Sequence, residues 1–320
     1  MFPDRLKSPS VNELAFGYGA QIGAAGYAKI DLIKRDWKNF YATRLTQDVP
    51  KANTPLNIPV DLGVIQNTSD IKRNYRAVQF QGQWNPKRTQ LGINYTWSKL
   101  RGNDEGETAG SGPVTNLPLN LYYPEYASYA QRLPVGYLSA DQRHRLRAWA
   151  GYDVYAGPLG NLNASILQSY DSGRPYAAAF AADLLNYSGA PKLPGYVAGG
   201  PSTGTYYLNG SRDAYRLQGA WSTDLALNYG LPIWRAQLFV RATATNIFNK
   251  HALTGSPTGG GFSTTVNAAG NAAGFKPFNP FTDAPVAGVN YAFASNFGQA
   301  TSFTGYQAAR TYAGSFGVRF

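Results

Sequence analysis

The sequence predicts an all-β fold: an antiparallel, up-and-down transmembrane β-barrel with long extracellular loops and short periplasmic turns. Two observations predict it. Apolar and polar residues alternate with a period of two along most segments, and the 3.6-residue period of helices is hard to find. Short and long connections also alternate along the chain, which gives about nine strands. Segments of roughly 10 alternating residues have the length that a tilted membrane-crossing strand needs.

The predicted strands are separated by two kinds of connection. The clearest strands cover residues 14–22, 90–98, 143–152, 221–229, 237–245 and 311–320. Short turns are expected at 23–26, 86–88, 157–160 and 231–234, and long loops at 45–70, 103–141, 174–214 and 249–310. Four loops longer than about 15 residues are uncommon in a compact soluble domain. They are expected on the outer side of a membrane barrel, whose other end carries tight turns.

Composition excludes several classes of protein. The 320 residues are 14% aromatic and only 15% charged, so the chain is not of the disordered class. It has no cysteine, which excludes a disulfide scaffold and a thiolate metal site. The sequence contains no run of about 18 apolar residues, so it predicts no membrane-spanning helix. The first ten residues, MFPDRLKSPS, lack the apolar core of a signal peptide, so we expect a chain that has lost its leader or an N-terminal part.

Aromatic residues favour a membrane barrel over a soluble β-sandwich, which would also alternate. They fall near both ends of the predicted strands. Those beside the short turns are Trp84, Tyr152, Tyr155 and Tyr229, and those near the long loops are Tyr41, Trp97 and Tyr170. Amphipathic rings at both strand ends form the interfacial girdles of membrane barrels.

The opposite face of the strands is polar. Arg143, Arg145 and Arg147 alternate along one strand, and Arg241 lies on the polar side of another, so these arginines are predicted to face the lumen. Two roles stay open for them: pairing with acidic residues of neighbouring strands or of a plug, or drawing an anionic ligand through the lumen. His144 lies on the other side of its strand and is expected at the interface.

Five stretches follow one another along the chain: 31–41 (DLIKRDWKNFY), 95–106 (YTWSKLRGNDEG), 141–147 (DQRHRLR), 168–176 (QSYDSGRPY) and 244–249 (ATNIFN). In this order they resemble the C-terminal barrel portion of TonB-dependent outer-membrane receptors, especially the Oar-like branch. The motif residues that carry the resemblance are Tyr95, Trp97, Asp141, His144, Asn246, Phe248 and Asn249. Val318 and the closing Phe320 resemble the signal read by the barrel-assembly machinery, although Ser315 and Ala313 depart from it.

The resemblance implies a function in nutrient uptake. The family barrel has about 22 strands, so nine strands at its end would be strands 14 to 22. Residues 1–320 would then be a partial barrel without the plug domain and without the TonB box, and TonB would act only through the missing plug. The cargo of the intact receptor would be a siderophore, a cofactor, a peptide or a saccharide, captured by the tyrosine-rich loops. The expected location is the outer membrane of a Gram-negative bacterium.

Other classes are weighed beside this one. A stand-alone outer-membrane adhesin or passive pore and a soluble β-rich binding domain remain alternatives. No enzyme, cofactor or metal is predicted, because the two histidines are isolated and the nucleophile-like Gly200-Pro201-Ser202-Thr203-Gly204 lies in a loop. The net charge of +11 is scattered, so no nucleic-acid partner is predicted. Lys and Arg at the outer rim would instead meet membrane lipid and lipopolysaccharide phosphates.

Overall fold

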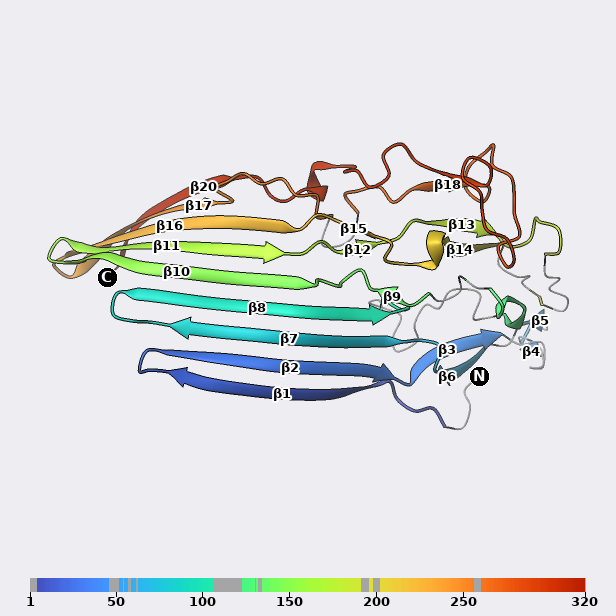
Figure 1. The fold of residues 1–320 in the computed structure, drawn as a ribbon, viewed down its shortest axis with the longest axis horizontal. Helices are drawn as coiled ribbons and strands as arrows, with labels where there is room; N and C mark the ends of the chain where they lie inside the picture. The colour runs from blue at the N-terminus through green and yellow to red at the C-terminus, as the bar shows by residue number, and fades with distance from the viewer. Residues whose placement is uncertain are drawn as a thin grey trace.

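The structure, a computed structural model, describes residues 5–45, 52–53, 55–56, 59–61, 63–105, 123–129, 131, 134–190, 196–197, 202–255 and 260–319. Nine long strands form one antiparallel sheet, joined in chain order as an up-and-down meander (Figure 1). They are β1 (Ser10–Ile22), β2 (Gly26–Lys38), β7 (Arg73–Trp84), β8 (Thr89–Gly102), β10 (His144–Gly157), β11 (Gly160–Asp171), β16 (Ala220–Ile233), β17 (Ala236–Thr245) and β20 (Thr311–Arg319). The predicted all-β meander is confirmed.

The two ends of the sheet differ as the sequence predicts. At one end, tight turns join β1 to β2, β7 to β8, β10 to β11 and β16 to β17 (Figure 1). The last of these turns lies later than predicted. Strand β16 continues to Ile233, which pairs with Ala236, and Trp234 takes the positive φ of 54° that a two-residue hairpin requires.

At the other end, the long connections build a layer of short strands, which we call the loop layer. It contains the paired strands β3 (Phe40–Leu45) with β6 (Gly63–Thr68), β4 (Ala52–Asn53) with β5 (Pro59–Val60), β12 (Pro175–Tyr176) with β15 (Tyr215–Arg216), β13 (Ala179–Asp183) with β14 (Thr203–Tyr207), and β18 (Val266–Ala268) with β19 (Tyr291–Phe293). Strand β9 (Gly136–Tyr137) extends the main sheet beside β8. The layer also holds the single 3₁₀ turns η2 (Pro124–Tyr126), η3 (Leu208–Gly210) and η4 (Phe303–Gly305). Among the described residues, no helix is long and apolar enough to cross a membrane.

Strand register sorts the side chains of the main sheet into two faces. Tyr18, Ile30 and Phe80 are directly opposite one another on β1, β2 and β7. The same row continues through Tyr95, Leu146, Tyr170 and Trp221 on the next four strands. Because successive residues of a strand point to opposite faces, this row and its alternate neighbours define one face, the apolar face. The intervening residues form the polar face.

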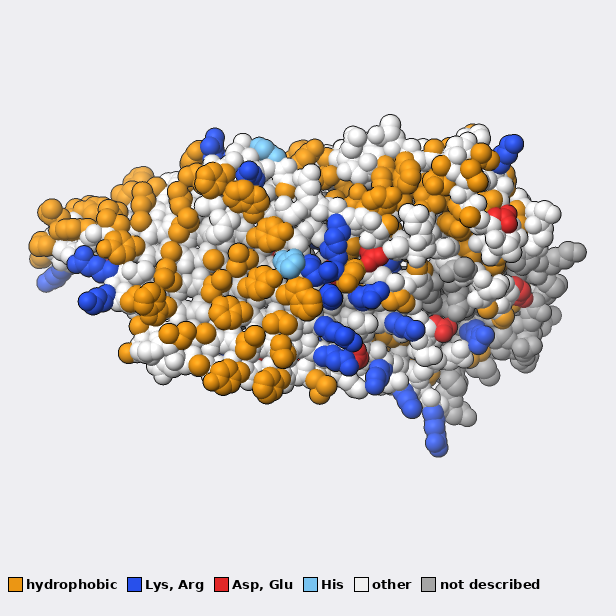
Figure 2. All heavy atoms as spheres, viewed as in Figure 1, with side chains coloured by type: hydrophobic (Ala, Val, Ile, Leu, Met, Phe, Trp, Pro, Cys, Tyr) orange, Lys and Arg blue, Asp and Glu red, His pale blue; other side chains and the backbone are white. Residues whose placement is uncertain are grey.

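The apolar face has no second protein layer over it in the part of the chain that the structure describes. Phe16 is 69% exposed, Leu227 52% and Val318 47%. In a β-sandwich these side chains would be buried against a facing sheet. The soluble sandwich is therefore not the observed arrangement, and the sheet presents its apolar side to its surroundings (Figure 2).

The dry core of the molecule lies in the loop layer instead. Side chains from three separate connections pack there, among them Tyr126, Phe180, Leu208 and Val266, each less than 5% exposed, and the partly buried Leu45 of a fourth connection packs against them. A small second cluster joins Phe40 and Ala42 of β3 to Ile71. The long loops are thus held by their own hydrophobic core at the end of the sheet.

Candidate functional site

The arginine series lies at the loop end of the polar face. Arg145 is paired in register with Asp171 of β11, and its Nε lies 3.2 Å from that carboxylate. Arg147 reaches the other oxygen of Asp171 at 2.6 Å. One acidic side chain on the neighbouring strand thus serves two arginines, and this geometry favours the pairing role over that of a free cationic ladder. Arg241 lies on the same face, between Asn228 and Ser315.

Asp141 forms a charged centre just before β10. Its side chain has no exposed surface. It accepts a hydrogen bond from the backbone N–H of Leu100 at 2.8 Å and pairs with Arg216 at 2.6 Å and Arg143 at 3.7 Å. Because a buried charge is tolerated only with partners of this kind, Asp141 fixes the loop layer to the end of the sheet.

Tyr137 completes this centre, and no motif in the sequence predicts its role. Its ring lies under the guanidinium groups of Arg143 (4.3 Å), Arg101 (5.3 Å) and Arg216 (5.3 Å). Cation–π contacts of this kind stabilise clustered arginines that a single carboxylate does not neutralise. Arg216 follows Asp141 by 75 residues, so only the folded chain reveals the pairing.

Three motif residues, Tyr95, Trp97 and His144, lie on the apolar face. Tyr95 and Trp97 belong to β8, and Trp97 is opposite His144 in register. The Tyr95 hydroxyl lies 2.8 Å from Nδ1 of His144, and their rings stack. This places His144 at the loop end of the apolar face, among aromatic rings. Tyr41, expected near that end, belongs instead to β3 of the loop layer.

The motif at residues 244–249 makes a turn that connects β17 to the loop layer. Asn246 has a φ of 48°, is buried, and its side-chain amide donates to the carbonyl oxygens of Lys250 and Ala308. Asn249 accepts a hydrogen bond from the N–H of Arg310 at 3.0 Å. Asparagine tolerates this left-handed backbone better than most residues. Phe248 is exposed and lies against Trp221.

The tyrosine-rich long loops are predicted to capture ligand, but several of their tyrosines are buried. Tyr126, Tyr129 and Tyr206 are buried in the core of the loop layer. Desolvation raises the pKa of Tyr126 to about 12, and burial also raises the pKa of Tyr129 and Tyr206. These three tyrosines therefore belong to a core of the loops and not to a ligand-binding surface.

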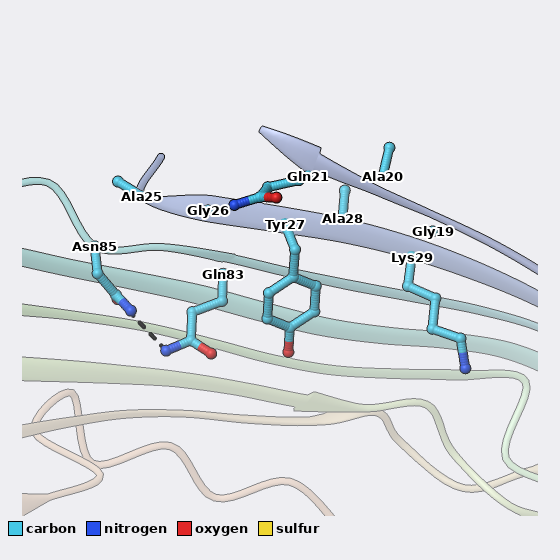
Figure 3. A pocket seen from close by; sticks show the side chains of 10 residues that line it. All are labelled: Gly19, Ala20, Gln21, Ala25, Gly26, Tyr27, Ala28, Lys29, Gln83 and Asn85. Carbon is cyan, nitrogen blue, oxygen red and sulfur yellow. Dashed lines mark hydrogen bonds between the residues drawn. The ribbon is translucent and has the colours of Figure 1, made fainter. Parts of the chain in front are cut away.

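Two of the surface cavities lie beside polar side chains of the loop layer and of the turn end of the sheet. One, of about 590 Å³, lies in the loop layer and is lined by Tyr176, Tyr207, Phe262, Arg174 and Arg212, among others. The other, of about 520 Å³, lies near the turn end of β1, β2 and β7 (Figure 3). There Tyr27, Lys29 and Gln83 point to the same side of the sheet (Figure 3). Among the described residues, no group of three or more potential metal ligands gathers.

Val318 and Phe320 are the residues of the expected assembly signal. Val318 lies on β20, on the apolar face, opposite Leu238. Phe320 lies outside the described residues, so its role in assembly stays a prediction.

Comparison with known proteins gives no family assignment. No protein-family model matches the chain, and no curated protein matches it. Among solved structures, it is similar to the outer membrane transporter YddB from Escherichia coli, with a TM-score of 0.44 and 13% identity over 79% of this chain and 31% of that one. It is also similar to the FrpB iron transporter from Neisseria meningitidis (F3-3 variant), with a TM-score of 0.42 and 13% identity over 78% of this chain and 29% of that one. The chain spans less than a third of the length of either transporter. Neither similarity bears on the Oar-like branch.

Proposed function

We propose that this chain is part of the barrel of a TonB-dependent outer-membrane receptor and that the complete barrel takes up a nutrient such as a siderophore, a cofactor, a peptide or a saccharide. The observation that carries the proposal is the division of the nine-stranded sheet into two faces. One face is apolar and uncovered, and the other carries amides, hydroxyls and ion pairs. A lipid bilayer covers the first kind of face, and an aqueous path runs along the second.

The dimensions of the strands support this orientation. Strand β16 has 14 residues, which at roughly 3.3 Å per residue is about 45 Å. Tilted by about 40°, it crosses the apolar band of roughly 25 Å in an outer membrane. On its apolar face, Trp221 lies near the loop end and Tyr229 near the turn end, at the two levels where amphipathic rings meet lipid headgroups.

The open edges of the sheet support a larger barrel. Strands β1 and β20 end the sheet, and each pairs with a single neighbour among the described residues. An unpaired edge in a bilayer leaves backbone groups without hydrogen bonds, which the hydrocarbon region does not tolerate. We therefore assign residues 1–320 to one part of a barrel whose other strands complete the pairing of both edges. The barrel-assembly machinery would meet this part at β20.

The role proposed for the chain is transport, without catalysis. The polar face lines the path, and the loop layer with its hollow of about 590 Å³ stands over the entrance. In such a receptor, movement of a plug through TonB supplies the energy, so residues 1–320 alone provide the wall and no active transport. Within that family we propose the Oar-like branch, which the sequence motifs resemble.

Fractionation tests the membrane assignment. Cells that export the chain together with the rest of its receptor should hold it in the outer-membrane fraction, and carbonate should not extract it. A chain that is monomeric and soluble without detergent would contradict the assignment and favour the soluble β-rich binding domain. Retention in the membrane with passive leakage of small solutes would favour the pore.

An uptake assay tests the transport assignment. Cells that produce the chain with the rest of its receptor should accumulate the nutrient only when TonB is present. Cells with residues 1–320 alone should not accumulate it, and TonB-dependent uptake by these cells would contradict the proposed division of labour.

A further inference from the structure

A row of cations crosses three neighbouring strands on the apolar side of the sheet. Lys34 of β2 is directly opposite Arg76 of β7, and Arg76 is directly opposite Lys99 of β8. Arg101 follows two residues later on the same face. Figure 2 shows Lys and Arg gathered where the apolar strands give way to the loop layer. We call Lys34, Arg76, Lys99 and Arg101 the cationic band.

The band is short of negative charge. Like charges directly opposite on neighbouring strands have Cβ atoms about 5 Å apart and destabilise the pair. Asp36 lies 3.1 Å from Lys34 and is the one acidic residue in the two cross-strand rows of β1, β2, β7 and β8 that contain the band. Lys99 lies over the ring of Trp97 at 5.0 Å. Within the described chain, no ion pair is found for Arg76, Lys99 or Arg101.

A cationic groove of about 730 Å³ adjoins the band. Its lining includes four exposed cations, Arg5, Lys7, Lys38 and Lys72, together with neutral amides and hydroxyls of β6, β7 and the residues beside them. No ion pair to these four cations is found among the described residues. Arg73 also lines the groove and lies over the ring of Trp37 at 5.1 Å. The one carboxylate in the lining is that of Asp36, which is already held by Lys34. Band and groove together carry nine basic side chains.

The position of the band decides what can neutralise it. On the apolar face, the row just below it consists of Phe16, Leu32, Val78 and Trp97. From that row to the tight turns, the outward positions of these strands carry no charge. If the apolar face lies in hydrocarbon, the band lies at the level of the lipid headgroups at the loop end.

The rest of the rim differs. At the loop end of β16 and β20, single cations lie over aromatic rings, Lys250 over Trp221 and Arg310 over Tyr312. No cross-strand row of cations occurs on the apolar face there. Of these two parts of the apolar face, only the one formed by β1, β2, β7 and β8 therefore carries a cross-strand row of cations.

We infer that the cationic band and groove bind the phosphate groups of a membrane lipid that carries at least two phosphates. The inference rests on the proposed function, because it takes the apolar face to lie in the bilayer. Guanidinium groups bind phosphate oxygens in pairs, and ammonium groups add point charges. The band and the groove supply two adjoining sites, which suits one headgroup with two phosphates. The sequence predicts contact with lipopolysaccharide phosphates anywhere along the outer rim. The cationic band and groove place the proposed binding site at the loop end of β1, β2, β7 and β8.

Binding in detergent micelles tests the inference without requiring membrane insertion. The probe is bisphosphoryl lipid A, with monophosphoryl lipid A and inorganic phosphate beside it, and the readout is native mass spectrometry of the full chain. The triple variant Lys34→Gln, Arg76→Gln, Lys99→Gln should bind bisphosphoryl lipid A at least tenfold more weakly. The control Lys87→Gln, Arg88→Gln, Arg235→Gln removes three exposed cations at the tight turns and should change binding less than twofold.

The two triple variants and the phosphate competition together show why lipid A binding is lost. Equal losses in both triple variants would show attraction to net charge and overturn the inference. If millimolar inorganic phosphate displaced all of the bound lipid A, the site would be one for a free anion, and the inference would also be overturned. The conservative variant Lys34→Arg, Lys99→Arg should bind like the parent chain, which separates lost charge from a disturbed fold. Outer-membrane insertion of the chain together with the rest of its receptor is measured separately, so a chain that binds lipid A but is not found in that membrane contradicts the proposed function alone.

Discussion

The main sheet and the loop layer arrange the same kinds of residue in opposite ways. In the sheet, Phe16 is 69% exposed and Phe316 89%, whereas in the loop layer Phe180 is 4% exposed and Tyr126 has no exposed surface. The loop layer buries its rings as a water-soluble domain does, and the sheet turns them outward. Aromatic residues alone therefore do not distinguish a membrane strand from an extracellular core. Their period along the chain does.

The largest expected effect comes from truncating a side chain in the loop core. Leu184 is 1% exposed in the loop layer, so Leu184→Ala should destabilise that layer by about 2–5 kcal/mol, because it removes packed methyl groups and leaves a cavity. Limited proteolysis of the loops in denaturant measures the change. Leu227→Ala, at an exposed position on β16, is the matched control and should leave the loops equally resistant. Equal sensitivity in both variants would remove the contrast between the two regions.

A charge on the apolar face should affect only the sheet. Leu227→Arg should disfavour insertion by about 2–4 kcal/mol if the residue lies near the bilayer midplane, and Leu225→Arg or Leu238→Arg should act in the same way. Partitioning between membrane and aqueous fractions in urea measures it. Ala226→Arg puts the same charge on the polar face, between Ser165 and Thr243, and should insert normally. An unchanged yield for Leu227→Arg would contradict the orientation.

The junction between the two regions depends on Asp141. Asp141→Asn should cost about 1.5–3 kcal/mol, because hydrogen bonds to a charged partner are lost and Arg143 and Arg216 remain close together. Hydrogen exchange should show faster opening around β9 and β15, with the sheet interior unchanged. Asp171→Asn, whose carboxylate is 27% exposed, should have the smaller effect of the two. The reverse order would show that the charged centre does not anchor the loop layer.

Alkaline pH should loosen the loop layer before the sheet. The pKa of Tyr126 is raised from 10.0 to about 12 by burial, so between these values the unfolded chain loses a proton that the folded chain keeps. Stability of the layer is therefore complete below pH 10 and falls as the pH rises toward 12. Near-UV circular dichroism followed with phenolate absorbance measures it. Phenolate formation by all tyrosines near pH 10 without loss of structure would contradict this burial.

The sheet could be predicted from the sequence because each strand carries its own signal. Alternation alone placed Leu225 and Leu227 on one side and Arg145 on the other, and no partner had to be known. The pairing of Arg145 with Asp171 needed the register between two strands, which alternation does not give. The turn at Trp234 was placed too early because Pro232, a residue typical of turns, stands inside the strand.

The loop layer could not be predicted in the same way. Its core joins Tyr126, Phe180 and Val266 from connections far apart in the chain, and such residues have no common period. The tyrosines of the long loops were therefore interpreted together as a ligand-binding surface, although Tyr126, Tyr129 and Tyr206 belong to the core. The charged centre was missed for the same reason, since Arg216 meets Tyr137 and Asp141 only after folding.

The central claim is that lipid covers the apolar face of the sheet. The chain has no cysteine, so single cysteines along β16 from residue 221 to 230 can carry spin labels without background. In membranes that hold the assembled barrel, labels at 221, 223, 225, 227 and 229 should collide mainly with oxygen dissolved in lipid, and labels at the positions between them mainly with a water-soluble nickel chelate. The account predicts this two-residue period along the whole strand. Labels at 225 and 227 that reach the nickel chelate as readily as the label at 226 would contradict it.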